Sequence, residues 1–253
     1  MNIPIFCVFL RTFFIGSVWN YERMQNVGFV FSIIPWLKKI YGDTKTFYER
    51  VRIHYGFFNT HPYFASILIG ITMKLEEQYS KNESSSDNVL RTKTLLAGPI
   101  AAIGDRLIWS TWRVFCGMLV VGYFLIHGRN FYITSNVWTG VIGFLLLYNF
   151  IGHLPIRFFG LYLGYKYSKE IIEKIAKFGL QKIAKVVRTS GIVFLLFTSV
   201  IYSLSLIDNK FLVVLFWFNV IISLFLHKKF NDEILVFLIT LFFNILLFIF
   251  LKI

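Results

Sequence analysis

The stretch Trp19–Asn26, W-N-Y-E-R-M-Q-N, places seven polar or ring-bearing side chains in eight positions beside long apolar runs. A charged side chain at the centre of a bilayer costs several kcal/mol, so a polar cluster next to membrane segments usually faces a protein partner or a water-filled cavity. Glu22 and Arg23 make this stretch the first candidate for a binding site.

The composition around this stretch is that of an integral membrane protein. Hydrophobic residues make up 57% of the chain and charged residues 15%, which is far more apolar than a soluble domain of this length. The net charge of +13 is spread between apolar segments, a pattern that fits anionic membrane lipids and excludes a nucleic-acid partner. Cys7 and Cys116 lack a C-x-x-C spacing and are expected to be packing residues.

Three apolar segments near the polar stretch are not expected to cross a membrane alone. Asn2–Val18 lacks the basic start and the cleavage site of a secretory signal, so we expect it to be retained, lying on the membrane or entering it obliquely. Val27–Leu37 and Tyr63–Leu75 are each too short for a bilayer. They are predicted to be half-length helices.

The segments between these runs are polar. Tyr41–Tyr55 is predicted to form a short surface helix, with either Asp43 or Thr44 as its N-cap. Glu76–Thr94 is also polar, and Ser84–Asp87 has the composition of a loop. Both segments are expected at the solvent or at the membrane interface.

A second unusual stretch runs from Leu95 to Arg113. Gly98-Pro99 and Gly104-Asp105 interrupt an otherwise apolar helix, which predicts a half-length segment, a tight bend and then a helix to about Ile126. Broken backbone at membrane depth is tolerated only where protein or a cavity satisfies the freed amides. The bend is therefore a second candidate site.

The remainder of the chain alternates between spanning and surface segments. Phe131–Gly152 is long enough to span, and Leu154–Tyr165 is expected to be a further partial segment. Lys166–Ser190 repeats apolar residues at helical spacing and carries seven basic residues against Glu170 and Glu173, which predicts a basic amphipathic helix on the cytoplasmic face. Three C-terminal spans are predicted to follow, at Ile192–Ile207, Phe211–Leu226 and Ile234–Leu251.

These segments together predict an all-α, polytopic membrane protein with re-entrant or discontinuous half-helices, a basic amphipathic surface helix and three C-terminal spans. We expect residues 1–190 to form a core of interfacial, re-entrant and spanning helices. Residues 191–253 are expected to form the C-terminal transmembrane helices.

Four ordered blocks of the sequence resemble a known family. They are residues 19–42 (WNYERMQNVGFVFSIIPWLKKIYG), 57–77 (FFNTHPYFASILIGITMKLEE), 98–112 (GPIAAIGDRLIWSTW) and 160–182 (GLYLGYKYSKEIIEKIAKFGLQK). The family is the IID membrane subunit of mannose/fructose/sorbose-type phosphotransferase systems. The resemblance implies a multi-pass protein of the bacterial cytoplasmic membrane that pairs with a IIC subunit to form the pathway for a hexose-type sugar. It also implies soluble IIA and IIB phosphocarrier subunits and a trimer of IIC–IID pairs.

Two residues depart from the family pattern. Arg106 stands where relatives usually have proline or a small residue, and Val114 replaces a common proline. Arg106 could pair with Asp105 or reach a lipid headgroup, and the sequence leaves both interpretations open. A membrane scaffold or sugar sensor without transport remains the alternative to a transporter.

No catalytic constellation is visible in the sequence. The five histidines (His54, His61, His127, His153 and His227) lack metal-ligand or dyad spacing, so we expect no metal, no cofactor and no catalytic residue. His61 is the only histidine in a strong motif, and we interpret it as a hydrogen-bonding residue at a helix start rather than a phosphate acceptor. In the resembled system the phosphorylated residues lie on the soluble subunits.

The candidate substrate-binding residues come from the two unusual stretches and from the segment before Pro62. If Trp19–Asn26 is helical, Asn20 and Arg23 share one face and Glu22, Gln25 and Asn26 a neighbouring one. Polar groups of this kind hydrogen-bond sugar hydroxyls, and aromatic rings stack on sugar rings. The alternatives are that Glu22 and Arg23 pair with IIC or neighbouring residues, and that Asp105 caps a helix. The complete set is Trp19, Asn20, Glu22, Gln25, Asn26, Asn59, His61 and Asp105.

Overall fold

The computed structural model describes residues 3–127, 133–177, 179–206 and 210–230, together with Ile239 and Phe242. Within these residues the named elements are all helices, and two isolated β-bridges join loops. Three helices in this described part of the chain are long and apolar enough to cross a membrane, which confirms the predicted all-α membrane fold. They are Ser86–Ile126, Ser135–Tyr167 and Leu180–Ser205.

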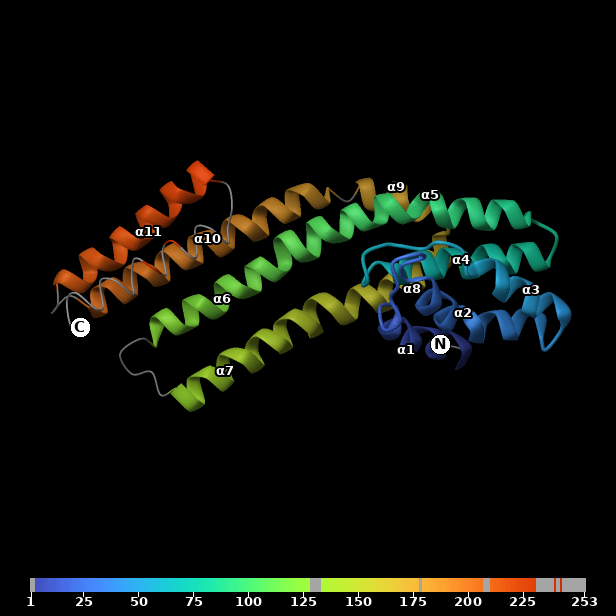
Figure 1. Cartoon of the computed structure of the whole chain (residues 1–253), viewed down its shortest axis with the longest axis horizontal. Coiled ribbons are helices and arrows are strands. Elements are labelled where there is room, and N and C mark those ends of the chain that lie inside the picture. Colours follow the sequence, from blue (N-terminus) through green and yellow to red (C-terminus); the bar gives the residue numbers. More distant parts are fainter. Residues whose placement is uncertain are drawn as a thin grey trace.

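Two of the long helices are built from several segments each. The first joins α5 (Ser86–Gly104), the π-helical η2 (Asp105–Trp112) and α6 (Arg113–Ile126). The second joins α7 (Ile133–Leu146), the π-helical η4 (Leu147–His153) and α8 (Leu154–Tyr167). They run side by side for much of the length of the molecule (Figure 1).

The bend expected at Gly98-Pro99 and Gly104-Asp105 is wrong, because the helix continues through both pairs. The extra residue per turn of η2 takes up the irregularity instead, as π-helical turns do inside longer helices. The Thr111 hydroxyl donates to the carbonyl oxygen of Arg106 at 2.9 Å, five residues earlier, and so satisfies one carbonyl within the widened turns. The prediction of a separate partial segment at Leu154–Tyr165 is also wrong, since α8 continues η4.

Four short helices gather at one end of the molecule, beside the start of α5 and the end of α8 (Figure 1). They are α1 (Ile3–Arg11), α2 (Asn26–Tyr41), α3 (Lys45–His54) and α4 (Ala65–Ser80), with the 3-10 turn η1 (Thr12–Phe14) after α1. The 16 residues of α2 and of α4 rise about 24 Å each, less than the bilayer core, as the sequence predicts. Of the two cap candidates, Thr44 is the one that accepts from Phe47 N, at 3.3 Å.

The closest helix pairing in this end is that of α4 with α8. A Cβ atom added to Gly70 of α4 would come within 2.7 Å of the backbone nitrogen of Tyr165. One added to Gly164 of α8 would meet the backbone of Ile67, and one added to Gly160 would meet Ser66 and Ile67. Small residues spaced by four positions let membrane helices approach in this way. The hydrophobic core lies around this contact and includes Phe29, Ile33, Leu68, Ile69 and Leu161.

The basic surface helix expected over Lys166–Ser190 is divided. A short α9 (Glu170–Lys177) is followed by Gly179, whose φ of +62° is a left-handed conformation that favours glycine. Beyond it α10 (Leu180–Ser205) begins with the basic residues and continues without a break into its apolar half. The prediction missed that the second half of the basic segment and the next span are one helix.

The last described helix, α11 (Lys210–Phe230), contacts the end of α10, where the rings of Tyr202 and Phe216 lie 5.3 Å apart (Figure 1). The predicted spans Ile192–Ile207 and Phe211–Leu226 fall largely on α10 and α11. The third predicted span, Ile234–Leu251, lies outside the described residues apart from Ile239 and Phe242.

Candidate functional site

The polar stretch Trp19–Asn26 is not helical before Asn26. It forms a tight turn in which the amide nitrogen of Met24 donates to Asn20 O at 2.9 Å, and it then pairs with a second loop. Gln25 N donates to Phe58 O at 2.8 Å, and Phe58 N donates to Arg23 O at 3.3 Å. We call the paired segments, residues 19–26 and 55–62, the loop crossing. The helical faces considered for this stretch therefore do not exist.

Gln25 holds the two segments of the loop crossing together. Its side-chain amide donates to the carbonyl oxygen of Thr60 at 2.9 Å and accepts from Thr60 N at 3.2 Å. The Thr60 hydroxyl in turn donates to Ala97 O of α5 at 3.0 Å. Both side chains are buried, so these bonds fix the loops against α5 and leave the Gln25 amide no exposed face.

Asn20 and Asn26 tie the same crossing to α3. Asn20 Nδ2 donates to Asn26 Oδ1 at 3.2 Å, and Asn26 Nδ2 donates to Tyr55 O, just after α3, at 2.7 Å. Asn26 is buried and Asn20 half-buried. The two amides thus satisfy backbone groups that the non-helical loops leave free.

His61 belongs to the loop crossing and is buried, with 1% of its surface exposed. Its ring packs on Gly104, where an added Cβ would come within 2.5 Å of the His61 Cβ, and it lies 4.9 Å from the Trp109 ring. Burial and the charge of Arg157 lower the pKa of His61 to about 4, so the ring is neutral at neutral pH. Its Nδ1 accepts from Tyr63 N at 3.2 Å, which favours the hydrogen-bonding role at the helix start.

The remaining predicted residues near the crossing are accessible. Trp19 is exposed and its ring contacts that of Tyr21 edge-on, with centroids 4.7 Å apart. Arg23 Nε donates to Glu22 Oε1 at 3.1 Å, so these two exposed side chains pair with each other. Asn59 is exposed too. We call Trp19, Glu22 and Asn59 the exposed rim of the loop crossing.

Asp105 lies apart from that rim, within η2. It is half-buried, and η2 has no side-chain cap bond, so the proposed capping role is wrong. Among the described residues Asp105 and Arg106 form no ion pair. The structure connects the two unusual stretches through His61, which belongs to the loop crossing and packs on Gly104.

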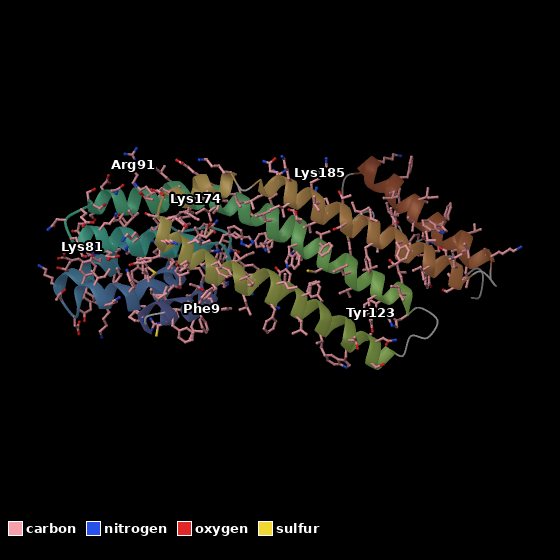
Figure 2. All side chains as sticks on the ribbon, turned by 180° about the vertical axis from the view of Figure 1, so that it is seen from behind. Phe9, Lys81, Arg91, Tyr123, Lys174 and Lys185 are labelled. Atoms are coloured by element: carbon pink, nitrogen blue, oxygen red, sulfur yellow. The ribbon has the colours of Figure 1, made fainter. Side chains whose placement is uncertain are left out.

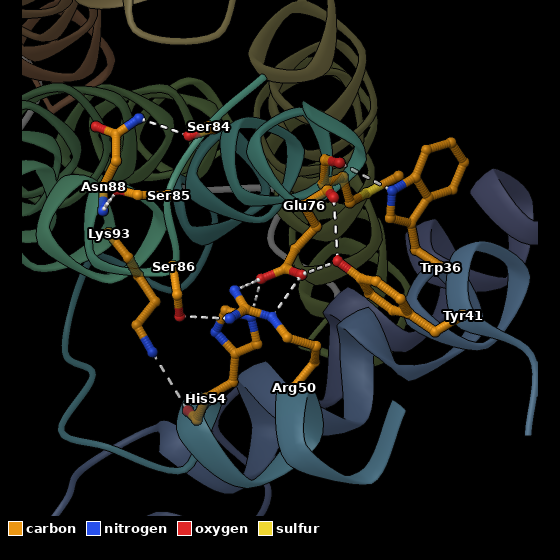
Figure 3. A network of polar contacts seen from close by, with 11 residues as sticks. Trp36, Tyr41, Arg50, His54, Glu76, Ser84, Ser85, Ser86, Asn88 and Lys93 are labelled. Atoms are coloured by element: carbon orange, nitrogen blue, oxygen red, sulfur yellow. Dashed lines mark hydrogen bonds and ion pairs between the residues drawn. The ribbon is translucent and has the colours of Figure 1, made fainter. Parts of the chain in front are cut away.

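A buried ionic network that the sequence did not predict lies next to the loop crossing (Figure 3). Glu76 of α4 is fully buried and accepts from two nitrogens of Arg50, Nε at 2.9 Å and Nη2 at 2.5 Å. His54 Nε2 lies 2.8 Å from Glu76 Oε1, and the Tyr41 hydroxyl donates to Oε2 at 2.8 Å. Arg50 also donates to the Ser86 hydroxyl at 2.5 Å. The Glu76 network joins α2, α3, α4 and α5.

The charges in the Glu76 network follow from these contacts. Burial opposes ionisation of Glu76, but the hydrogen bonds from His54 and Arg50 outweigh it and lower the pKa of Glu76 to about 2. Burial also lowers the pKa of His54, so the ring is neutral and donates from Nε2 to the carboxylate. The result is one carboxylate facing one guanidinium, with neutral donors completing its shell.

Lys93 connects this network to the loop crossing. Its Nζ donates to His54 O at 3.3 Å and lies 4.8 Å from the centroid of the Phe29 ring and 6.0 Å from that of Phe58. Phe58 belongs to the crossing, and Lys93 is almost completely buried. Aromatic faces and a carbonyl thus stabilise this buried cation.

Sequence analysis missed the network because its members lie 22 and 26 residues apart and in segments expected at the surface. The one available signal was Glu76 itself, which ends an apolar run. Among the described residues no group of three or more His, Cys, Asp or Glu side chains could hold a metal ion.

Comparison with known proteins identifies the family. The model of the "PTS system mannose/fructose/sorbose family IID component" matches residues 4–253, nearly the whole chain. The chain belongs to this IID family. This membership agrees with the four sequence blocks, and the three membrane-length helices among the described residues agree with a membrane protein.

The IID relatives are named for different sugars. The chain is 32% identical over 180 residues to the mannose-specific EIID component of Escherichia coli strain K12, covering 70% of this chain and 60% of that protein. It is 31% identical over 182 residues to the fructose permease IID component of Bacillus subtilis, covering 72% of this chain and 62% of the relative. The chain therefore spans about 60% of the length of these relatives.

Two solved structures resemble the fold. One, described as the structure of a membrane protein, has a TM-score of 0.65 and 31% identity, with 76% of this chain and 68% of the other covered. The other is a complex of the mannose transporter ManYZ with microcin E492, with a TM-score of 0.58 and 30% identity over 79% of this chain and 70% of that one. The IID fold is thus shared with a transporter.

Proposed function

We propose that this IID chain forms, with a IIC subunit, the membrane pathway of a phosphoenolpyruvate-dependent sugar phosphotransferase system. The observation that carries the proposal is the family match over residues 4–253. The likeness to a chain of the mannose transporter ManYZ supports it. In this proposal the sugar is a hexose, IIA and IIB carry the phosphoryl group, and three IIC–IID pairs assemble in the bacterial cytoplasmic membrane.

We assign the binding role to the exposed rim of the loop crossing. Trp19 presents an aromatic ring that a sugar ring can stack on, and Glu22 and Asn59 present hydrogen-bonding groups. Asp105 of η2 is half-buried and is a further candidate, apart from the rim. Each group contacts either the sugar or the IIC subunit that completes the pathway.

The buried members of the predicted set have a different role in this proposal. Gln25, Asn26 and His61, together with the half-buried Asn20, hydrogen-bond within the chain and hold the two loops in register. A binding surface needs such support, because loops position side chains only as well as their own backbone is fixed. In this proposal these four residues do not contact the sugar or IIC themselves; they keep the rim residues in position.

The proposed division of the chain into a core (1–190) and C-terminal membrane helices (191–253) falls within α10. The two parts would then share one helix, whose basic start belongs to the core and whose apolar end belongs to the membrane.

The experiment is co-expression with a matching IIC subunit in cells that lack their own IID, followed by phosphoenolpyruvate-dependent sugar uptake. Uptake that requires both chains is the expected result. Asn59→Ala is expected to lower uptake with the complex intact, whereas Gln25→Ala lowers both uptake and the amount of folded chain. Assembly with IIC but no uptake of any hexose would refute transport and indicate a scaffold or sensor. Unaltered uptake in both variants would refute the site assignment.

A further inference from the structure

A basic groove lies between η2 and the start of α10. It has a volume of about 510 Å³ and is lined by four cationic side chains from the two helices. They are Arg106, Lys182, Lys185 and Arg188. Among the described residues neither aspartate nor glutamate lines it, so the groove concentrates positive charge.

None of these four cations forms an ion pair with an acidic group in the described part of the chain. Asp105 precedes Arg106 directly and yet does not pair with it, and the three cations of α10 are exposed. Lys185 is labelled in Figure 2, where it lies along the same edge of the molecule as Arg91 and Lys174. Four unneutralised cations around one groove favour an anionic ligand.

An apolar groove continues from the basic one along α10. It has a volume of about 730 Å³, and Lys185 and Thr189 line both grooves. Beyond these shared residues its walls are mainly apolar side chains, among them Val186, Val193 and Phe197. A ligand that fills both grooves therefore has a charged end and an apolar end.

The position of the boundary along α10 has a simple physical meaning. The last cation of the helix is Arg188, and from Gly191 to Ser205 the helix carries no charged residue. Such a change from basic to apolar residues marks the level of the lipid headgroups in a membrane helix. Trp112 of η2 lines a small cavity together with Ile183 and Val187 of α10, and tryptophan is enriched at that level.

We propose that the paired grooves bind one anionic phospholipid, with its phosphate among Arg106, Lys182, Lys185 and Arg188 and an acyl chain along Val193 and Phe197. Basic pockets between membrane helices bind anionic headgroups in this manner. An acidic protein surface would match the four cations but would have no use for the apolar continuation. Bound there, the lipid joins η2 to α10 and gives Arg106 its partner.

The test uses the full chain purified in detergent, with phosphatidylglycerol or phosphatidylcholine added, and native mass spectrometry to count retained lipid. We expect preferential retention of phosphatidylglycerol. The triple variant Arg106→Gln, Lys182→Gln, Arg188→Gln is expected to lose at least about tenfold in that preference. The matched control Lys38→Gln, Lys39→Gln, Arg52→Gln removes the same charge from exposed cations of α2 and α3 and is expected to keep it.

A second variant tests the apolar groove without changing any charge. Val193→Trp fills that groove and is expected to reduce retention of phosphatidylglycerol, while Val200→Trp, exposed on the same helix, does not. Equal retention by the triple variant and its control would overturn the proposal. Retention unchanged by Val193→Trp would also overturn it and would leave an acidic protein or a free phosphate as the ligand of the cations.

Discussion

Replacing Glu76 with glutamine removes the only carboxylate that faces Arg50 in the Glu76 network. Arg50 Nε and Nη2 donate to the two carboxylate oxygens at 2.9 and 2.5 Å, so the amide group of the new side chain would direct a donor at one of these nitrogens. Removing one partner of a buried ion pair costs about 3–5 kcal/mol, because the other charge stays buried. For a chain of this size that corresponds to a fall of roughly 6–20 °C in the unfolding midpoint.

The assay is thermal unfolding of the purified chain in detergent, followed by tryptophan fluorescence. Glu49→Gln is the matched control, since Glu49 is exposed and lies 4.0 Å from Lys45 across one helical turn. Exposed pairs of this kind contribute about 0–1 kcal/mol, so the control is expected to change the midpoint little. A midpoint of Glu76→Gln equal to that of Glu49→Gln would refute the reasoning.

The pH dependence provides a second check on the same substitution. The pKa of Glu76 is about 2 in the folded chain, below its ordinary value of 4.5, so its contribution to stability is present above about pH 5 and is lost as the pH falls toward 2. The difference in unfolding midpoint between wild type and Glu76→Gln should therefore be largest near pH 7 and smaller at pH 3.5. A difference independent of pH would contradict the assigned ionisation.

Two further substitutions test the contacts around the loop crossing. Gly104→Ala is expected to displace His61 and lower the unfolding midpoint by several degrees, whereas Gly98→Ala on the same helix, with open space around it, should not; equal midpoints would contradict the packing. Arg157 donates to Thr12 O and, at 2.5 Å, to His153 Nε2, so Arg157→Met is expected to increase hydrogen exchange in residues 3–14 while leaving α10 unchanged. If Arg157→Met changed hydrogen exchange equally in residues 3–14 and in α10, Arg157 would not be a specific anchor of the first helix.

Local signals predicted much of this fold correctly. The short apolar runs at Val27–Leu37 and Tyr63–Leu75 indicated helices too short to span. The corresponding helices α2 and α4, of 16 residues each, are too short to span a bilayer. Thr44 followed the ordinary chemistry of an N-cap and caps α3. These features depend on residues that are neighbours in the chain, so composition and spacing are enough to predict them.

Gly104 shows where local signals were misleading. Glycine followed by aspartate has the chemistry of a turn, and the sequence offers no other use for the missing side chain. In the structure that absence makes room for the ring of His61, which comes from a distant loop, and the helix does not turn. A packing use of glycine depends on which segment lies opposite, which spacing along one chain does not reveal.

The candidate site was predicted in part for the same reason. Trp19–Asn26 stood out because polar residues beside apolar runs are costly, and the structure pairs this stretch with Asn59–His61. The separation of the set into exposed and buried members could not be predicted, since Glu22 and Gln25 are equally polar in the sequence. The Glu76 network escaped notice because its ion pair joins two different helices.

The central claim is that the exposed rim contacts the sugar or the IIC subunit, and the most direct measurement is uptake per assembled complex. Asn59→Ala is compared with Asn82→Gly, an exposed asparagine beyond α4 whose φ of +60° glycine adopts without strain. We predict that Asn59→Ala keeps the wild-type unfolding midpoint and loses most phosphoenolpyruvate-dependent uptake, while Asn82→Gly keeps both. Wild-type uptake per complex together with wild-type assembly with IIC, in Asn59→Ala and equally in Trp19→Ala, would contradict the claim.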